Sequence, residues 1–150
     1  MTPEKDKPIL EYIVLFALII APLVFFAYFK NQEVNFSRRA FTGLVQGGVS
    51  AQRMIDWPNF KALEADIGKS YLQLPDDKQR ALYRKNFIKN FSLGFKQSEA
   101  KPDAFTNWRI YDSDSEKVVV AADYPQKKKT LLFTLSKLSG KRLVSMQWKE

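Results

Sequence analysis

An uninterrupted apolar segment near the amino terminus constrains this chain most strongly. The run YIVLFALIIAPLVFFAYF, from Tyr12 to Phe29, contains no charged residue. Extended to residue 9 and coiled as a helix, it reaches about 30 Å, the thickness of the hydrocarbon core of a bilayer. The sequence therefore predicts one transmembrane helix over residues 9–30, preceded by a short tail of residues 1–8.

The ends of this segment carry residues that are typical of membrane interfaces. Tyr12 lies at one end, and Tyr28 and Phe29 lie at the other, where aromatic rings are favoured at headgroup level. Lys30 can extend its ammonium group towards water. Pro22 would interrupt a helix in water but is common inside membrane spans. We interpret these five residues as the membrane anchor.

A cleaved signal peptide is the main alternative to an anchor. Such a peptide needs a shorter apolar core, followed by small residues at the cleavage site. Residues 24–29 read VFFAYF instead, and their bulky side chains disfavour cleavage. We therefore expect an uncleaved, single-pass membrane protein.

The charges beside the segment do not fix its orientation. Lys5 and Lys7 precede it, whereas Lys30, Arg38 and Arg39 follow it, so the positive-inside count is balanced. Long domains are translocated largely regardless of charge. We expect the short tail in the cytoplasm and the large domain on the non-cytoplasmic side, either periplasmic or extracellular.

Residues 31–150 have the length of one compact domain with its own core. Helical patterns fill residues 35–98, and short alternating segments follow over residues 104–148. Because helices precede strands instead of alternating with them, the pattern predicts an α+β domain. We expect the transmembrane helix to be followed by helices packed on a four-stranded antiparallel sheet.

Three helical segments are expected in this domain. The first covers residues 35–54, although Gly43 and Gly47 mark a weak point or bend. The second is short and runs from Asn59 to Ile67. The third covers residues 75–95, with acidic residues in its first turn, where they face the positive end of the helix dipole.

The third helix has a strongly aromatic face. Aromatic residues recur at every fourth position, which aligns them on one side of a helix: Tyr83, Phe87, Phe91 and Phe95. Core packing against the sheet is the first interpretation. A cavity for a small hydrophobic molecule between this helix and the sheet is the second.

Four strands are expected over residues 104–111, 117–124, 130–138 and 142–148, joined as an antiparallel meander. Alternation assigns one side chain in two to the core face. The predicted core residues of the strands are Trp108, Ile110, Val118, Val120, Ala122, Leu131, Phe133, Leu135, Val144, Met146 and Trp148.

The chain is basic, with a formal net charge of +8. Two groups of cations are candidates for contact with anionic lipid headgroups or an acidic subunit. One is the turn formed by Lys127, Lys128 and Lys129, and the other is a helix face with Lys78, Arg80, Arg84, Lys85 and Lys89. Solvated surface is the alternative for both groups. No recognised single-strand motif supports a nucleic-acid partner.

The composition restricts catalytic chemistry. The chain has no histidine and no cysteine, so the commonest general base and the thiol nucleophile are missing. Asp112, Asp114 and Glu116 resemble a calcium loop only in their spacing and are expected to form a polar turn. We expect no catalytic residue, no metal or cofactor site, and no enzymatic activity.

The order of elements, together with the closing segment Lys141–Trp148 (KRLVSMQW), resembles the nuclear-transport-factor-2-like superfamily, also called the cystatin-like α+β roll. The resemblance covers roughly residues 50–150. Domains of this family occur on single N-terminal anchors in bacterial envelope assemblies, including assembly factors of type IV secretion. The resemblance implies a scaffold-like role and carries over no functional residue.

Three functions remain open at this point. The first is a non-enzymatic membrane-anchored subunit or assembly factor of a membrane protein complex, which binds its partners through the span and the α+β domain. The second is a membrane-anchored binder of a hydrophobic small molecule or lipid. The third is a hydrolase or isomerase that uses the same cavity.

Overall fold

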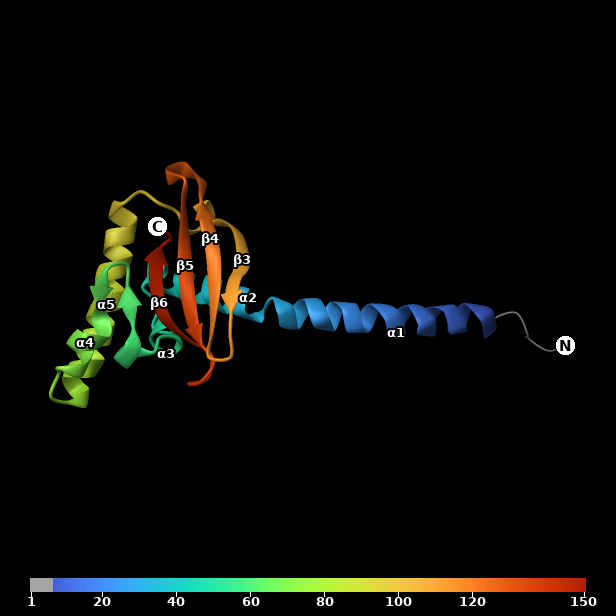
Figure 1. Cartoon of the computed structure of the whole chain (residues 1–150), viewed down its shortest axis with the longest axis horizontal. Helices are drawn as coiled ribbons and strands as arrows, with labels where there is room; N and C mark the ends of the chain where they lie inside the picture. The colour runs from blue at the N-terminus through green and yellow to red at the C-terminus, as the bar shows by residue number, and fades with distance from the viewer. Residues whose placement is uncertain (1–6) are drawn as a thin grey trace. The chain divides into compact units, whose positions relative to one another are not determined.

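The computed structural model of the protein describes residues 7–150. It has an α+β architecture and divides into two compact units, one that ends at Gln32 and one that runs from Glu33 to Glu150 (Figure 1). The α+β fold class expected from the sequence is confirmed.

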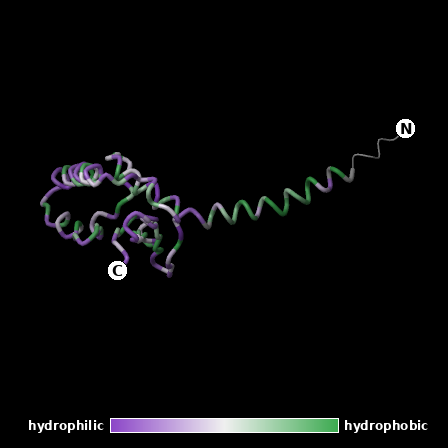
Figure 2. The backbone as a smooth tube through the Cα atoms, turned by 90° about the horizontal axis from the view of Figure 1, so that it is seen from above, coloured by the Kyte–Doolittle hydropathy of each residue, from purple (hydrophilic) through white to green (hydrophobic). Residues whose placement is uncertain are grey.

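The first unit contains helix α1, Lys7–Lys30. Its segment Glu11–Phe29 is exposed along its whole length and is long and apolar enough to cross a membrane. Figure 2 shows this continuous apolar character. The predicted apolar helix is confirmed, but it begins at Lys7. Residues 7 and 8 of the predicted tail therefore belong to α1, and residues 1–6 lie outside the described residues.

The described chain contains four further α-helices. Their bounds are α2 Gln32–Gln46, α3 Ala51–Met54, α4 Ile67–Leu72 and α5 Asp77–Gln97. A short 3-10 turn, η1, covers Trp57–Asn59. The helix expected over residues 75–95 is thus present as α5, and the carboxylate of Asp76 caps it by accepting a 2.7 Å hydrogen bond from the backbone N–H of Gln79.

The helix expected over residues 35–54 is divided into α2 and α3. Gly47 has φ +72°, a left-handed conformation that glycine adopts without strain, and it follows the last residue of α2. A Cβ atom on Gly43 would lie 3.2 Å from the Cβ of Ala51, so a glycine here lets α3 fold back closely onto α2. Gly47 therefore ends α2, and Gly43 allows α3 to pack closely against α2.

The prediction of a short helix over residues 59–67 is wrong. This segment contains the end of η1 and a small hairpin of two strands, β1 Lys61–Ala62 and β2 Ala65–Asp66. Helix α4 begins only at Ile67, where the Asp66 carboxylate accepts a 3.0 Å hydrogen bond from a backbone N–H. The hairpin depends on pairing with a strand at the far end of the chain, which a local pattern does not reveal.

The sheet has six strands in the order β2-β1-β6-β5-β4-β3. The four strands of the predicted meander are confirmed and are antiparallel. However, β1 pairs with β6 in parallel, with Lys61 opposite Ser145, so the sheet is mixed and has six strands, not four. The bounds of the meander strands are β3 Thr106–Ser113, β4 Lys117–Tyr124, β5 Lys129–Ser136 and β6 Arg142–Trp148.

Two of the predicted core positions in the strands are wrong because the register shifts at irregularities. The pairing of β5 with β6 shifts between Thr134 and Leu135, so Leu143 becomes fully buried in place of Val144, which is half-buried. Shifts in the pairing of β3 with β4 leave Ile110 39% exposed. The remaining predicted core residues of the strands are buried or packed against the core.

Phe41 of α2 joins the helices to the inner face of the sheet. Its ring lies 4.8 Å from Phe105, 5.5 Å from Phe133 and 5.6 Å from Phe95, measured between centroids. Phe105 directly precedes β3, Phe133 belongs to β5 and Phe95 belongs to α5. Figure 1 shows α2 crossing this face of the sheet. One side chain therefore connects three layers of the second unit.

Helix α5 packs mainly on other helices and not on the strands. Its most buried side chains are Ile88 and Ser92, and the Ser92 hydroxyl donates a 2.6 Å hydrogen bond to the carbonyl of Val45 at the end of α2. The aromatic residues of α5 are half-buried beside this contact line. One side of α5 is thereby fixed, and its aromatic flank remains partly open.

We predict that Phe41→Ala lowers the free energy of unfolding by about 3–5 kcal/mol, because it deletes a buried ring that many groups contact. Urea unfolding of the full chain in mild detergent, followed by tryptophan fluorescence, measures this. Leu138→Ala is the matched control, since Leu138 is 76% exposed, and we expect it to change stability by less than about 0.5 kcal/mol. Equal effects of the two changes would contradict the role given to Phe41.

Candidate functional site

Helix α1 carries the predicted anchor residues on an open surface. Tyr12, Tyr28 and Phe29 are 73%, 64% and 47% exposed, and Pro22 lies inside the helix. Lys30 is its last residue. The two tyrosines lie near opposite ends of the apolar segment, as membrane interfaces require.

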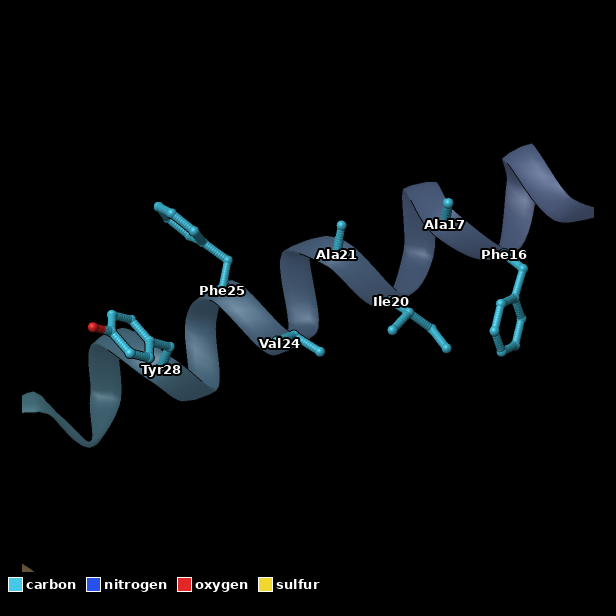
Figure 3. A pocket seen from close by; sticks show the side chains of 7 residues that line it. All are labelled: Phe16, Ala17, Ile20, Ala21, Val24, Phe25 and Tyr28. Atoms are coloured by element: carbon cyan, nitrogen blue, oxygen red, sulfur yellow. The ribbon is translucent and has the colours of Figure 1, made fainter.

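Shallow apolar grooves run along α1. Ala17 and Ala21 form the low points of one groove, between larger side chains (Figure 3). The complete lining of this groove is Phe16, Ala17, Ile20, Ala21, Val24, Phe25 and Tyr28. Such a surface is suited to lipid chains or to another apolar helix.

The second unit contains a cleft of about 330 Å³ between α5 and the ends of strands β4 and β6. Its surface is mainly apolar. The lining residues are Leu63, Asn90, Phe91, Gly94, Phe95, Ser98, Ala100, Phe105, Tyr124, Lys127 and Trp148. They come from five separate segments of the chain, so only the folded domain brings them together.

One wall of this cleft is a stack of three aromatic rings. Phe105 lies parallel to Tyr124, with centroids 4.8 Å apart and planes 9° apart. Trp148 is 6.4 Å from Phe105 and 6.3 Å from Tyr124, again with nearly parallel planes. The hydroxyl of Tyr124 is hydrogen-bonded to Oε1 of Gln126 at 3.0 Å. The wall therefore presents flat apolar faces in a fixed arrangement.

The opposite wall is the carboxyl-terminal half of α5. Phe91 and Phe95 supply its apolar side chains, and Gly94 lies between them. A Cβ atom on Gly94 would meet nothing within 4 Å. Neighbouring atoms therefore do not require a glycine at this position, and its missing side chain leaves the space of the cleft free.

The predicted lysine turn lies beside the cleft. Lys127 ends the 3-10 turn η3, Pro125–Lys127, and contributes to the lining. Lys128 is exposed with φ +50°. The Nζ atom of Lys129 lies 5.7 Å from the ring centroid of Trp148, within range of a cation–π interaction. The turn thus adds positive charge at the edge of an aromatic cavity.

The predicted cationic face of α5 is divided in two. Lys78, Lys85 and Lys89 are exposed. Arg80 and Arg84 instead lie over the ring of Tyr71 in α4, at 5.7 and 5.9 Å, and Nη1 of Arg84 donates a 2.9 Å hydrogen bond to its hydroxyl. These two arginines connect α4 to α5 and are only partly exposed.

The four predicted cavity residues also divide. Phe91 and Phe95 line the cleft. Phe87 contacts Trp57 and Phe60, with centroids 5.7 and 5.8 Å apart, as part of the core. Tyr83 does not line the cleft, and its hydroxyl donates a 3.5 Å hydrogen bond to the carbonyl of Ile67. Two of the four residues, Phe91 and Phe95, therefore line the cleft, and Tyr83 and Phe87 do not.

The acidic residues mainly hold turns. Oδ1 of Asp114 accepts 2.8 Å hydrogen bonds from the backbone N–H groups of Glu116 and Lys117, which hold the pKa of Asp114 below its ordinary value. Asp112 likewise accepts from the N–H of Ser113. Within residues 7–150, no three acidic side chains gather closely enough to hold a metal ion.

Asp123 forms a network that the sequence did not indicate. Its carboxylate accepts hydrogen bonds from Asn107 and Thr130, both at 2.8 Å, and from Arg109 at 2.9 Å. The bonds from Asn107 and Thr130, followed by the contact with Arg109, hold the pKa of Asp123 below 3.8. This network joins three adjacent strands and gives the carboxylate a structural role.

Comparison with known proteins gives no relative for this chain. No protein-family model, curated protein or solved structure matches it. The resemblance to the nuclear-transport-factor-2-like superfamily therefore stays a prediction.

We predict that Asp123 contributes to stability above its ordinary pKa of 3.8 and that this contribution is lost as the pH falls through its lower folded pKa. Below both values the protonated group no longer favours the folded state. Urea midpoints measured between about pH 6 and about pH 2.5 should decline less steeply for Asp123→Asn than for the wild type. Parallel declines would contradict this role.

Proposed function

We propose that this protein is a non-enzymatic, single-pass membrane-anchored subunit or assembly factor of a membrane protein complex. The observation that carries the proposal is the exposed apolar segment Glu11–Phe29, which a separately folded unit follows in the chain. Exposure of so large a continuous apolar surface to water is energetically unfavourable. The hydrocarbon core of a bilayer accommodates this apolar surface. The helix pairs its own backbone N–H and C=O groups, so it leaves none of them unpaired there.

The second unit supports a role in binding. It presents an aromatic cleft, lysines at the rim of that cleft, and further exposed lysines along α5. These features suit contact with an acidic protein surface or with anionic lipid headgroups. We propose that the span and the second unit act as two docking surfaces, a layout that agrees with the scaffold-like role implied by the family resemblance.

We further propose that the second unit lies on the non-cytoplasmic side of the membrane, in the periplasm or outside the cell. The support is the length of the domain that follows α1, because long domains are translocated largely regardless of their charge.

A second candidate function is the binding of a small hydrophobic molecule or lipid. The observation in its favour is the size of the cleft, about 330 Å³, which lies at the lower end of the range for ligand pockets. Phe91 and Phe95 would then contact the ligand.

Extraction in mild detergent from the source membrane separates these candidates. If the proposal is right, the chain of 17.4 kDa runs on a native gel as a larger particle, and native mass spectrometry finds a second polypeptide in fixed ratio. A monomer that retains only a small molecule would replace the proposed function with the second candidate.

We predict that the double change Leu18→Asp and Leu23→Asp releases the chain from membranes into the soluble fraction after alkaline extraction. Each aspartate at the centre of a span costs on the order of 3 kcal/mol of insertion free energy. The control Leu18→Ile with Leu23→Ile preserves apolarity and should remain in the membrane pellet.

Intact mass spectrometry of the mature wild-type chain completes this test. The proposal predicts a mass that includes α1. A mature amino terminus beyond Ala27 would mean that the apolar segment is a cleaved signal and would overturn the anchor.

A further inference from the structure

We propose that the cleft between α5 and the ends of β4 and β6 binds an acidic segment of a partner protein, which inserts one aromatic or large aliphatic side chain. This inference rests on the proposed function and specifies the partner's chemistry.

The cleft has the shape of a socket for one large side chain. Its volume of about 330 Å³ is open to solvent on one side. This volume is too small to enclose most of a lipid, and the wall of Phe105, Tyr124 and Trp148 offers flat faces to a ring. Binding energy in protein interfaces is concentrated in such pockets, where a single anchor residue is desolvated.

The charge around the cleft selects for acidic neighbours of the anchor. Among the described residues of its lining, Lys127 is the one charged residue and none is a carboxylate. Lys128 and Lys129 follow directly, and Lys129 is held over Trp148. A partner segment with aspartate or glutamate beside its anchor can therefore pair with the turn while the anchor fills the cleft.

Gly94 keeps the cleft open at a cost in stability. It lies inside α5, where glycine is about 1 kcal/mol less favourable than alanine. Gly94 is not among the glycines with positive φ, and a Cβ atom there would touch nothing within 4 Å. Neither backbone conformation nor packing requires the glycine, and a larger side chain at this lining position would take up space in the cleft.

Strained residues cluster around the same cleft. Among residues 7–150, four non-glycine residues have positive φ, and three of them lie in or beside it: Leu63 in its lining, Glu99 between two lining residues, and Lys128 next to Lys127. For a bulky residue such as Leu63 this conformation is unfavourable. It places an apolar side chain, 41% exposed, at the edge of the socket. Strain of this kind persists most often at binding sites.

The test uses the full wild-type chain in lipid nanodiscs as bait for a random dodecapeptide library displayed on phage. We expect the enriched peptides to share one aromatic or leucine residue flanked by aspartate or glutamate. A synthetic peptide of the most enriched sequence is then titrated by fluorescence anisotropy against the variants. We expect its affinity to fall as salt rises.

Two variants address the two halves of the site. Gly94→Leu fills the cleft, and we expect it to raise the Kd at least about tenfold while thermal unfolding shows an intact fold. Lys127→Glu reverses the charge of the rim, and we expect a Kd increase of about three- to tenfold that high salt reduces. Asn86→Leu on an exposed position of α5 and Lys117→Glu at the start of β4 are the matched controls, and we expect both to bind like the wild type.

Two results would overturn this proposal. One is a set of enriched peptides that lack acidic residues or bind Gly94→Leu as well as the wild type. The other is a fatty acid or lipid that native mass spectrometry finds on the wild type but not on Gly94→Leu, which would make the cleft a lipid site. If peptides bind as expected but the chain is found in the soluble fraction, the proposed membrane anchor is wrong and the proposed peptide site in the cleft is retained. If binding fails while the large native particle persists, the proposed function stands without this site.

Discussion

The aromatic contacts around Phe41 are the interaction on which the second unit depends. Phe41 brings α2 against the sheet through Phe133 and Trp108, and it reaches α5 through Phe95. Phe105 extends this cluster outwards, because it touches Phe41 on one side and stacks on Tyr124 on the other. The wall of the cleft is therefore a continuation of the core and is as firmly positioned as the core itself.

This continuity explains how the domain combines a stable fold with an unfilled apolar surface. Helix α5 is fixed along one line by Ile88 and by the hydrogen bond from Ser92 to Val45, and its aromatic flank stays half-open. Filling that flank would be easy, since Gly94 has free space above it. The glycine in α5 thus lowers the stability of the helix and leaves an open socket beside a basic turn. The surface of α1 is likewise not covered by any other part of the described chain. Both surfaces suit a protein that holds other components together.

Local periodicity in the sequence was sufficient for α1, for α5 and for the four meander strands, because each of them has a regular apolar pattern over many residues. The strands β1 and β2 have two residues each and exist through pairing with β6, so no local signal announced them. A one-residue irregularity between Thr134 and Leu135 places Leu143 in the core, where Val144 was predicted. For the candidate site, the sequence pointed to Phe91, Phe95 and the lysine turn, which the structure places at the cleft or beside it. Phe105, Tyr124 and Leu63 were missed because only tertiary folding brings these segments together.

Both exposed surfaces are expected to be covered in the native setting. Amide hydrogen exchange of the chain in its source membrane, compared with the purified chain in nanodiscs, measures this. Slow exchange is expected along α1 in both samples, and slower exchange of residues 90–98 and 125–130 is expected in the source membrane than after purification. Fast exchange along α1, or identical exchange of the cleft segments in both samples, would contradict it.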